Sequence, residues 1–257
     1  MALKVAVVGA TGRMGALSCR LIENSDDLEL AATLDSKSDL AEILQADVVL
    51  DFSIPATSPK VVSFAIEAGK NVLVGTSGWG AKEIEAVRKE VESSQGVGVL
   101  IVPNFSIGSV LATRFATTAA KYLRDFEIVE THASTKLDSP SGTAIRTAEQ
   151  MASARGAQNN PGTVPASKPQ EQRARGQLVE GVPVHSIRYP NANAKQQVIL
   201  AGEGEVLRIE HEAVSLTAYE AGILASLRYL PKVTGVQVGL DVVLGLAPLL
   251  SEGFLTK

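Results

Sequence analysis

The fold of this chain can be inferred from the stretch Val5-Ala6-Val7-Val8-Gly9-Ala10-Thr11-Gly12-Arg13-Met14-Gly15. Its first four residues form a continuous apolar run, which is typical of a strand buried on both faces of a parallel sheet. The glycines that follow have the spacing G-x-x-G-x-x-G, a variant of the G-x-G-x-x-G fingerprint. Such glycines let the backbone approach a pyrophosphate, which the free N–H groups of the next helix then bind. The stretch predicts a dinucleotide site, and a plain glycine-rich turn is the alternative.

Two later strand ends are expected to join this site, because ligands of open parallel sheets bind beyond the carboxyl ends of the strands. Gly75-Thr76-Ser77 follows the apolar run at residues 71–74, and Pro103-Asn104-Phe105 follows the run at 97–102. For either loop alone, ordinary turn chemistry is an equal alternative. The predicted cofactor-binding residues are Gly9, Thr11, Gly12, Arg13, Met14, Asp35, Gly75, Thr76, Ser77, Val102, Pro103, Asn104 and Phe105.

The choice between NAD and NADP stays open in the sequence. Asp35 follows the run at residues 28–34, where an acidic residue about 20 residues beyond the motif accepts hydrogen bonds from the adenosine ribose of NAD. Arg13 and Lys37 are expected nearby, and either can pair with the 2′-phosphate of NADP. The expected cofactors are therefore NADH and/or NADPH.

Apolar runs and helical patterns alternate through the first hundred residues. The expected strands cover residues 5–8, 28–34, 48–52, 71–74 and 97–102, and the expected helices cover residues 14–23, 39–44, 59–68 and 81–93. Strands separated by helices form a parallel sheet with right-handed crossovers. Together with the glycine-rich turn, this alternation predicts an α/β fold with a Rossmann-type parallel sheet.

The pattern changes in the second half of the chain. The expected elements are a helix at residues 107–123, a strand at 127–132, a helix at 143–154, a long surface loop at 156–181, strands at 184–188, 197–200 and 205–212, and a helix at 215–230. Consecutive strands without helices between them indicate a mixed or antiparallel sheet. A second, α+β domain is therefore expected.

Composition and charge exclude several classes of protein. An apolar fraction of 45% and a charged fraction of 20% exclude wholesale disorder. A net charge of −4 and an aromatic content of 4% provide neither a basic field nor a stacking platform for nucleic acid. The single cysteine, Cys19, excludes an intrachain disulfide and a cysteine-based zinc site, and no metal is expected. Neither a signal segment nor an apolar stretch of membrane-spanning length is visible, so we expect a cytoplasmic protein without a membrane partner.

Residues 130–144 combine three groups that suit catalysis. His132 can act as a general acid near neutral pH, and Lys136 supplies a compact cation for a carboxylate or a developing negative charge. Ser141-Gly142-Thr143 precedes an expected helix, whose N-terminal N–H groups would form a second anion site. Two anion sites beside an acid suit a small dicarboxylate substrate. The alternative is a strand histidine, a solvated lysine and an ordinary helix cap.

Several stretches, in this order and spacing, resemble the dihydrodipicolinate reductase family, the 4-hydroxy-tetrahydrodipicolinate reductases of lysine and diaminopimelate biosynthesis. They are residues 9–15, Gly75-Thr76-Ser77, Pro103-Asn104-Phe105-Ser106 and residues 132–144. Gly181-Val182-Pro183-Val184-His185-Ser186-Ile187-Arg188 is similar to the family's Gly-Val-x-x-His-Ser-x-Arg strand. The resemblance covers nearly the whole chain, and Lys-x-Asp-x-Pro-Ser-Gly-Thr-Ala is its most specific element.

The resemblance implies a fold and a reaction. Residues 1–104 with 215–257 would form a dinucleotide-binding Rossmann domain, and residues 105–214 a substrate-binding and oligomerisation domain with an open mixed sheet. The implied activity is the NAD(P)H-dependent reduction of 4-hydroxy-tetrahydrodipicolinate to tetrahydrodipicolinate by a homotetramer.

The resemblance also implies residue roles. His132 matches the family's proton donor, and Lys136 matches its catalytic and substrate-binding lysine. Gly142 and Thr143 match the substrate-carboxylate site, to which Ser141 is added for its place at the expected helix start.

The chain departs from the family beside the proton donor. Ala133 stands where a second histidine is common, Ser134 and Thr135 stand where a basic residue is frequent, and Ser139 replaces the usual alanine. Ala133 indicates either a weaker substrate affinity or a family member that reduces another imine or carbonyl dicarboxylate.

Other classes of function are disfavoured. A non-catalytic dinucleotide-binding protein would need neither His132 nor Lys136. A short-chain dehydrogenase usually needs Tyr-x-x-x-Lys, and no tyrosine of this chain has a lysine four positions later. The other two histidines, His185 and His211, lie on strand-like runs and are interpreted as structural or surface residues.

Overall fold

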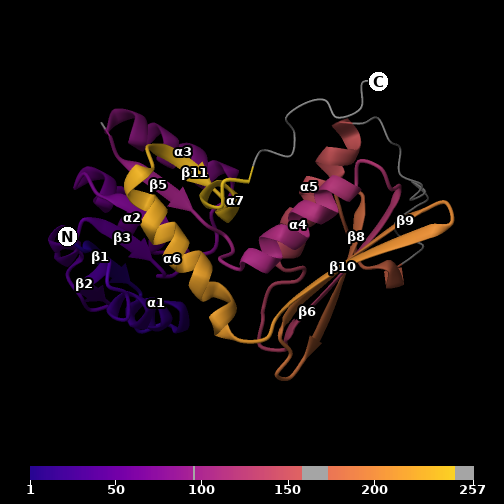
Figure 1. Ribbon diagram of the computed structural model, residues 1–257, viewed down its shortest axis with the longest axis horizontal. Coiled ribbons are helices and arrows are strands. Elements are labelled where there is room, and N and C mark those ends of the chain that lie inside the picture. The colour runs from indigo at the N-terminus through magenta and orange to yellow at the C-terminus, as the bar shows by residue number, and fades with distance from the viewer. Residues whose placement is uncertain (95, 158–172, 247–257) are drawn as a thin grey trace. The chain divides into compact units, whose positions relative to one another are not determined.

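The computed structural model describes residues 1–94, 96–157 and 173–246. Within them the chain divides into two compact units, each with a sheet of its own (Figure 1). The first unit consists of Met1–Ile107 and Leu216–Leu246, and the second of Gly108–Ser215. The chain therefore leaves the first unit, builds the second, and returns.

The first unit contains a six-stranded sheet in the order β11-β5-β4-β3-β1-β2. Its strands are β1 Leu3–Val8, β2 Leu28–Leu34, β3 Val48–Asp51, β4 Asn71–Val74, β5 Gly98–Ile101 and β11 Gly235–Val238. Every neighbouring pair is parallel, which confirms the Rossmann-type sheet. The strand order reverses between β1 and β3, and ligands of such sheets bind at the carboxyl ends of the strands beside this switch point.

Helices cover both faces of this sheet. Helices α2 (Ser58–Glu67) and α3 (Ala81–Ser93) pack against alternate strand residues such as Val72 and Val74. Leu73 lies between these two valines and is fully buried, so its side chain points to the other face. Helices α1 (Arg13–Glu23) and α6 (Glu220–Tyr229) contact each other and form the layer on that face.

The second unit contains a five-stranded mixed sheet in the order β10-β9-β6-β8-β7. Its strands are β6 Asp125–Ala133, β7 Gln177–Val179, β8 Val182–Tyr189, β9 Ala194–Gly202 and β10 Glu205–Ala213. Only β6 and β8 run parallel; the other pairs are antiparallel. Helices α4 (Ile107–Ala119) and α5 (Gly142–Ala157) pack on one face, around Phe126 and Ile128 of the central strand β6. This unit confirms the predicted α+β domain with a mixed sheet.

Some expected elements need correction. The helix expected at residues 107–123 ends at Ala119, and the one expected at 215–230 is a 3-10 turn, Leu216–Tyr219, followed by α6. Of the loop expected at 156–181, residues 158–172 lie outside the described residues, but α5 reaches Ala157 and a 3-10 turn precedes β7. Strands β7 and β11 were not predicted: β7 has only three residues, and Gln237 interrupts the apolar run of β11. Each of the two has a single partner strand.

None of the helices in the described residues is both long and apolar enough to cross a membrane.

A close backbone contact in the first unit gives a testable prediction. Helix α6 packs so tightly on the loop after β5 that a Cβ at Gly222 would overlap the carbonyl oxygen of Phe105. Because the backbone must move to admit a methyl group, Gly222→Ala should lower the free energy of unfolding by about 1–3 kcal/mol in chemical denaturation.

Gly156→Ala is the matched control. Gly156 is also helical, but it is exposed and a Cβ there would meet nothing within 4 Å. Its replacement should raise stability, by at most about 1 kcal/mol, because alanine restricts the unfolded chain. A Gly222→Ala variant as stable as the wild type would refute this packing.

Candidate active site

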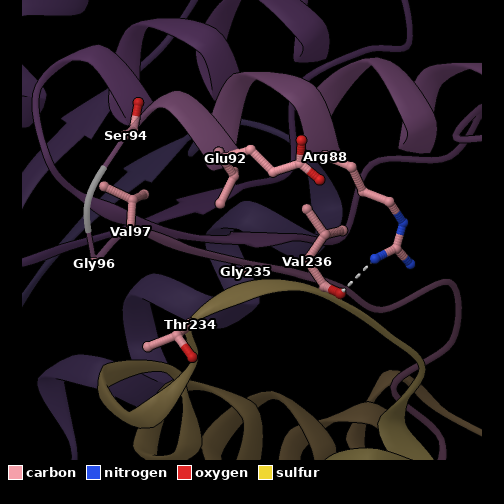
Figure 2. Close-up of a pocket in the computed structure, with 9 residues that line it drawn as sticks. Arg88, Glu92, Ser94, Gly96, Val97, Thr234, Gly235 and Val236 are labelled. Carbon is pink, nitrogen blue, oxygen red and sulfur yellow. Dashed lines mark hydrogen bonds between the residues drawn. The ribbon is translucent and has the colours of Figure 1, made fainter.

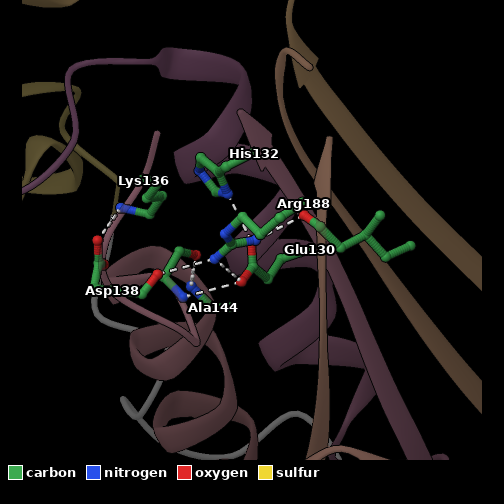
Figure 3. Close-up of polar contacts among 8 residues, drawn as sticks. Glu130, His132, Lys136, Asp138, Ala144 and Arg188 are labelled. Carbon is green, nitrogen blue, oxygen red and sulfur yellow. Dashed lines mark hydrogen bonds and ion pairs between the residues drawn. The ribbon is translucent and has the colours of Figure 1, made fainter. Parts of the chain in front are cut away.

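Strand β6 places two titratable side chains on one face of the second sheet. Glu130 and His132 are two residues apart, and side chains two apart on a strand share a face. Glu130 is fully buried, and its Oε2 lies 2.6 Å from Nδ1 of His132 (Figure 3). The side chain of His132 is 21% exposed, so its ring can still be reached by a ligand.

Arg188 of the neighbouring strand β8 supplies the opposite charge. It lies directly across from His132 in the parallel ladder, and its two terminal nitrogens donate to the two oxygens of Glu130 at 2.9 and 2.7 Å. Burial alone would raise the pKa of Glu130, but hydrogen bonds from His132, Arg188 and Ser186 together with the Arg188 charge lower it to about 2. The carboxylate is therefore ionised at neutral pH. It stabilises the folded protein above its ordinary pKa of 4.5, and this contribution is lost as the pH falls towards 2.

The loop after β6 carries Lys136 to the same region. Lys136 ends a turn in which its N–H donates to the carbonyl oxygen of Ala133, and its Nζ lies 2.7 Å from Oδ1 of Asp138. This hydrogen bond lowers the pKa of Asp138, with smaller contributions from the charges of Lys136 and His132. The carbonyl oxygen of Asp138 in turn accepts a hydrogen bond from Arg188 at 3.0 Å. Arg188 thus ties the loop to the buried carboxylate.

Helix α5 begins beside Glu130. The N–H of Ser141 donates to Oε1 of Glu130 at 3.2 Å, and the Ser141 hydroxyl accepts from the N–H of Ala144 at 3.2 Å. Gly142 is the first helical residue, and a Cβ there would meet nothing within 4 Å. Since the fold does not demand glycine at this position, its bare backbone is suited to the close approach of an anion at the helix N-terminus.

The predicted catalytic and substrate residues His132, Lys136, Ser141, Gly142 and Thr143 are thus brought together by β6, its following loop and the start of α5. The arrangement brings together an imidazole, an ammonium group paired with Asp138 and a helix N-terminus. These groups can hold a carboxylate and deliver a proton beside it.

Three residues of this cluster were not among the predicted site residues: Glu130, Asp138 and Arg188. Glu130 could have been found, because a glutamate two residues before a histidine on a strand shares its face. Arg188 depends on the pairing of β6 with β8, which the sequence alone does not give. His185 and His211 lie outside the cluster; His185 pairs with Glu127 at 2.6 Å, together with Arg175.

The predicted dinucleotide residues lie at the carboxyl ends of the first sheet's strands. The turn after β1 uses Gly9 with a left-handed φ of +78°, and Gly12 is the N-cap of α1. A Cβ at Gly9 would overlap the Phe52 carbonyl oxygen, and one at Gly15 would overlap the Gly9 carbonyl oxygen. At Gly12 a Cβ would lie 3.3 Å from the Gly9 carbonyl oxygen, a tight contact that needs only a small shift of the backbone. Of the three glycines in this turn, Gly12 is therefore the one that the packing of the fold requires least, which suits a position in contact with a ligand.

The other strand ends add polar groups at the same edge. Oδ1 of Asp35, after β2, accepts hydrogen bonds from the Lys37 N–H at 2.8 Å and the Ser38 hydroxyl at 3.3 Å. After β4, the Thr76 hydroxyl donates to the Asp51 carbonyl oxygen at 3.2 Å. After β5, Oδ1 of Asn104 accepts from the Ser106 N–H at 2.8 Å. These residues suit a dinucleotide laid across the strand ends.

A pocket of about 240 Å³ lies elsewhere in the first unit (Figure 2). It is bounded by the end of α3 and by Gly96, Val97, Thr234 and Gly235, which lead into β5 and β11. It therefore opens at the amino ends of the strands, away from the predicted dinucleotide residues. Within the described ranges, no group of three or more His, Cys, Asp or Glu side chains could hold a metal ion.

Comparison with known proteins assigns nearly the whole chain. The family model described as "Dihydrodipicolinate reductase, N-terminus" matches residues 3–105, and "Dihydrodipicolinate reductase, C-terminus" matches residues 108–244. The 4-hydroxy-tetrahydrodipicolinate reductase of Clavibacter sepedonicus is 51% identical over 242 residues, covering 94% of this chain and 86% of that protein. The enzyme of the same name from Cutibacterium acnes is 41% identical over 245 residues, covering 95% and 99%.

A solved structure agrees with these matches. Dipicolinate-bound dihydrodipicolinate reductase from Paenisporosarcina sp. TG-14 has a TM-score of 0.79 and 28% identity, with 94% of this chain and 99% of that chain covered. The paired family models, the relatives and the two-sheet fold all lead to one assignment: this chain belongs to the dihydrodipicolinate reductase family.

Proposed function

We propose that this protein reduces 4-hydroxy-tetrahydrodipicolinate to tetrahydrodipicolinate with NADH or NADPH, in lysine and diaminopimelate biosynthesis. The relatives' reaction is carried over to this chain by its identity to them along nearly the whole length. The structural observation that supports it most is the cluster of His132, Lys136 and the start of α5 around the buried Glu130.

The first unit is proposed to hold the dinucleotide. When bound, the reduced nicotinamide supplies the hydride for the reaction. The N–H groups at the start of α1 bind the pyrophosphate beside Gly12, and Asp35 contacts the adenosine ribose. The residues after β4 and β5 hold the nicotinamide end. Arg13 begins α1 after β1, and Lys37 follows Asp35 after the neighbouring parallel strand β2, so all three lie at the same edge of the sheet. For this reason we propose that both dinucleotides are accepted.

His132 is proposed as the proton donor. The substrate's 4-hydroxyl group leaves as water, the hydride goes to the ring carbon that carried it, and one proton goes to the neighbouring carbon. Because Nδ1 of His132 contacts the ionised Glu130, Nε2 is the nitrogen that gives this proton. Lys136 is proposed to bind one substrate carboxylate in place of Asp138 and to stabilise negative charge during the transfer. The N–H groups of Gly142 and Thr143 hold the other carboxylate at the start of α5.

A related substrate is the second candidate, and one observation favours it. Ala133 follows directly after His132 and offers only a methyl group where the family commonly has a second histidine. A family member with this change could reduce another imine or carbonyl dicarboxylate that needs one basic partner fewer.

We also propose that the protein is a homotetramer of the cytoplasm, with no nucleic-acid or membrane partner. The face of the second sheet opposite α4 and α5 exposes Ile187 and Tyr189, which are 45% and 52% accessible in the single chain. Apolar side chains gathered on a sheet face are suited to bury against another copy.

The function is tested by a steady-state assay with freshly generated 4-hydroxy-tetrahydrodipicolinate and each reduced cofactor. Wild-type protein should oxidise both NADH and NADPH. His132→Gln should lower kcat by about 10²–10⁴-fold, the usual value of general acid catalysis, and leave dinucleotide affinity nearly unchanged.

His185→Gln is the matched control, because His185 also contacts a glutamate at 2.6 Å but lies outside the cluster. Its activity should equal that of the wild type. A fully active His132→Gln variant would remove His132 as proton donor. If the wild-type protein does not turn over this substrate, the proposal fails in favour of the second candidate, the reduction of another imine or carbonyl dicarboxylate.

The dinucleotide site is tested at Gly12. Gly12→Ala and Gly12→Val should weaken NADH binding in that order, with valine losing more than about tenfold, or about 1.4 kcal/mol, in calorimetry. The melting temperature should fall only slightly, because the new Cβ would lie 3.3 Å from the Gly9 carbonyl oxygen and needs a small shift of the backbone. Folded variants with wild-type affinity would contradict this placement of the pyrophosphate.

A further inference from the structure

We propose that Glu130 is a positioning residue: it selects which nitrogen of His132 faces the substrate and connects this proton donor to the anion-binding turn of α5. The inference rests on the proposed function, since it concerns how the same site is assembled. It assigns no contact with the substrate to Glu130 itself.

The first step of the argument is the direction of one hydrogen bond. An ionised carboxylate can only accept, and Glu130 is fully buried and paired with Arg188. The contact of 2.6 Å between Glu130 and Nδ1 of His132 therefore requires the proton to be on Nδ1. In the neutral ring this leaves Nε2 as the acceptor, and in the protonated ring it makes Nε2 the nitrogen that can release a proton outward.

The second step concerns what keeps Glu130 in place. Arg188 uses both terminal nitrogens on the two carboxylate oxygens, in the two-point geometry that is the most directional for this pair. The same arginine donates to the carbonyl oxygen of Asp138, in the loop that carries Lys136. Figure 3 shows Glu130 and Arg188 between His132 and the start of α5. Because Arg188 fixes the position of the carboxylate, the orientation of the His132 ring is set by Glu130 and not the reverse.

The third step is the contact with α5. Oε1 of Glu130 accepts the N–H of Ser141, the residue directly before Gly142. One carboxylate therefore holds both the ring of the proton donor and the turn proposed to hold a substrate carboxylate. Because these two groups act on one small substrate, their spacing matters, and a variant at Glu130 should affect both binding and proton transfer.

The chain contains a matched control for this inference. Glu127, on the same strand, also contacts a histidine at 2.6 Å and an arginine, but the histidine is His185 and the contacting atom is Nε2. The two histidines should therefore be held in opposite tautomers, Nδ1–H for His132 and Nε2–H for His185.

The experiment is ¹⁵N NMR of histidine-labelled protein at a pH that leaves the rings neutral. The chain has three histidines, so His132→Gln and His185→Gln suffice to assign the signals. Wild-type His132 should be the Nδ1–H tautomer, and Glu130→Gln should convert it to a mixture while His185 is unchanged. Glu127→Gln should do the reverse. An Nε2–H tautomer at His132 in the wild type overturns the proposal without the need for any variant.

Steady-state kinetics supply the second readout. Glu130→Gln should lower kcat by at least about tenfold and also raise the KM for the dicarboxylate, with an unchanged Kd for NADH, whereas Glu127→Gln should leave kcat unchanged. A Glu130→Gln variant with wild-type kcat and KM overturns the proposal. If the wild type does not turn over the proposed substrate at all, the proposed function fails, and the tautomer of His132 still decides this inference on its own.

Discussion

The carboxylate of Glu130 is fully buried in the second unit, and an ionised carboxylate away from water must be paired with charge and hydrogen-bonded throughout. The chain meets this requirement with groups from three elements: His132 on β6, Arg188 on β8 and the Ser141 N–H before α5. The need to pair this carboxylate therefore fixes the positions of His132, Arg188 and the start of α5. The proposed proton donor and the helix N-terminus are near one another because both contact the same buried charge.

The division into two units separates the two kinds of binding that a reductase needs. The first unit offers parallel strand ends and a glycine turn. In this turn Gly9 and Gly15 are required by close backbone contacts, whereas Gly12 is the glycine proposed to lie against a ligand. The second places His132, Lys136 and the start of α5, the proposed acid, cation and anion-binding turn, beside a mixed sheet. Since β11 and α6 come from the end of the chain, the first unit is complete only after the second has been made.

Much of this arrangement can be predicted from the sequence, because its signals are local. Neighbouring residues are enough to predict a buried strand at residues 5–8 and a dinucleotide turn directly after it. They are also enough to predict a candidate catalytic segment from His132 to Thr143. The missing parts depend on pairing across the chain. Arg188 and Glu130 are 58 residues apart in sequence, and only the register of β6 against β8 brings them into contact. Strand β7 has only three residues, and Gln237 interrupts the apolar run of β11, so neither shows a clear strand pattern. The difference between Gly12 and Gly15 depends on distances to other backbone atoms.

The central claim, that one buried carboxylate assembles a dicarboxylate-reducing site in the second unit, is tested most directly by a crystal structure of this protein with dipicolinate and a nicotinamide dinucleotide. We expect one ligand carboxylate on the backbone N–H groups of Gly142 and Thr143, the other on Nζ of Lys136, and Nε2 of His132 facing the ring while Nδ1 stays on Glu130. Dipicolinate bound away from these residues, or a His132 ring turned so that Nδ1 faces the ligand, would contradict the account.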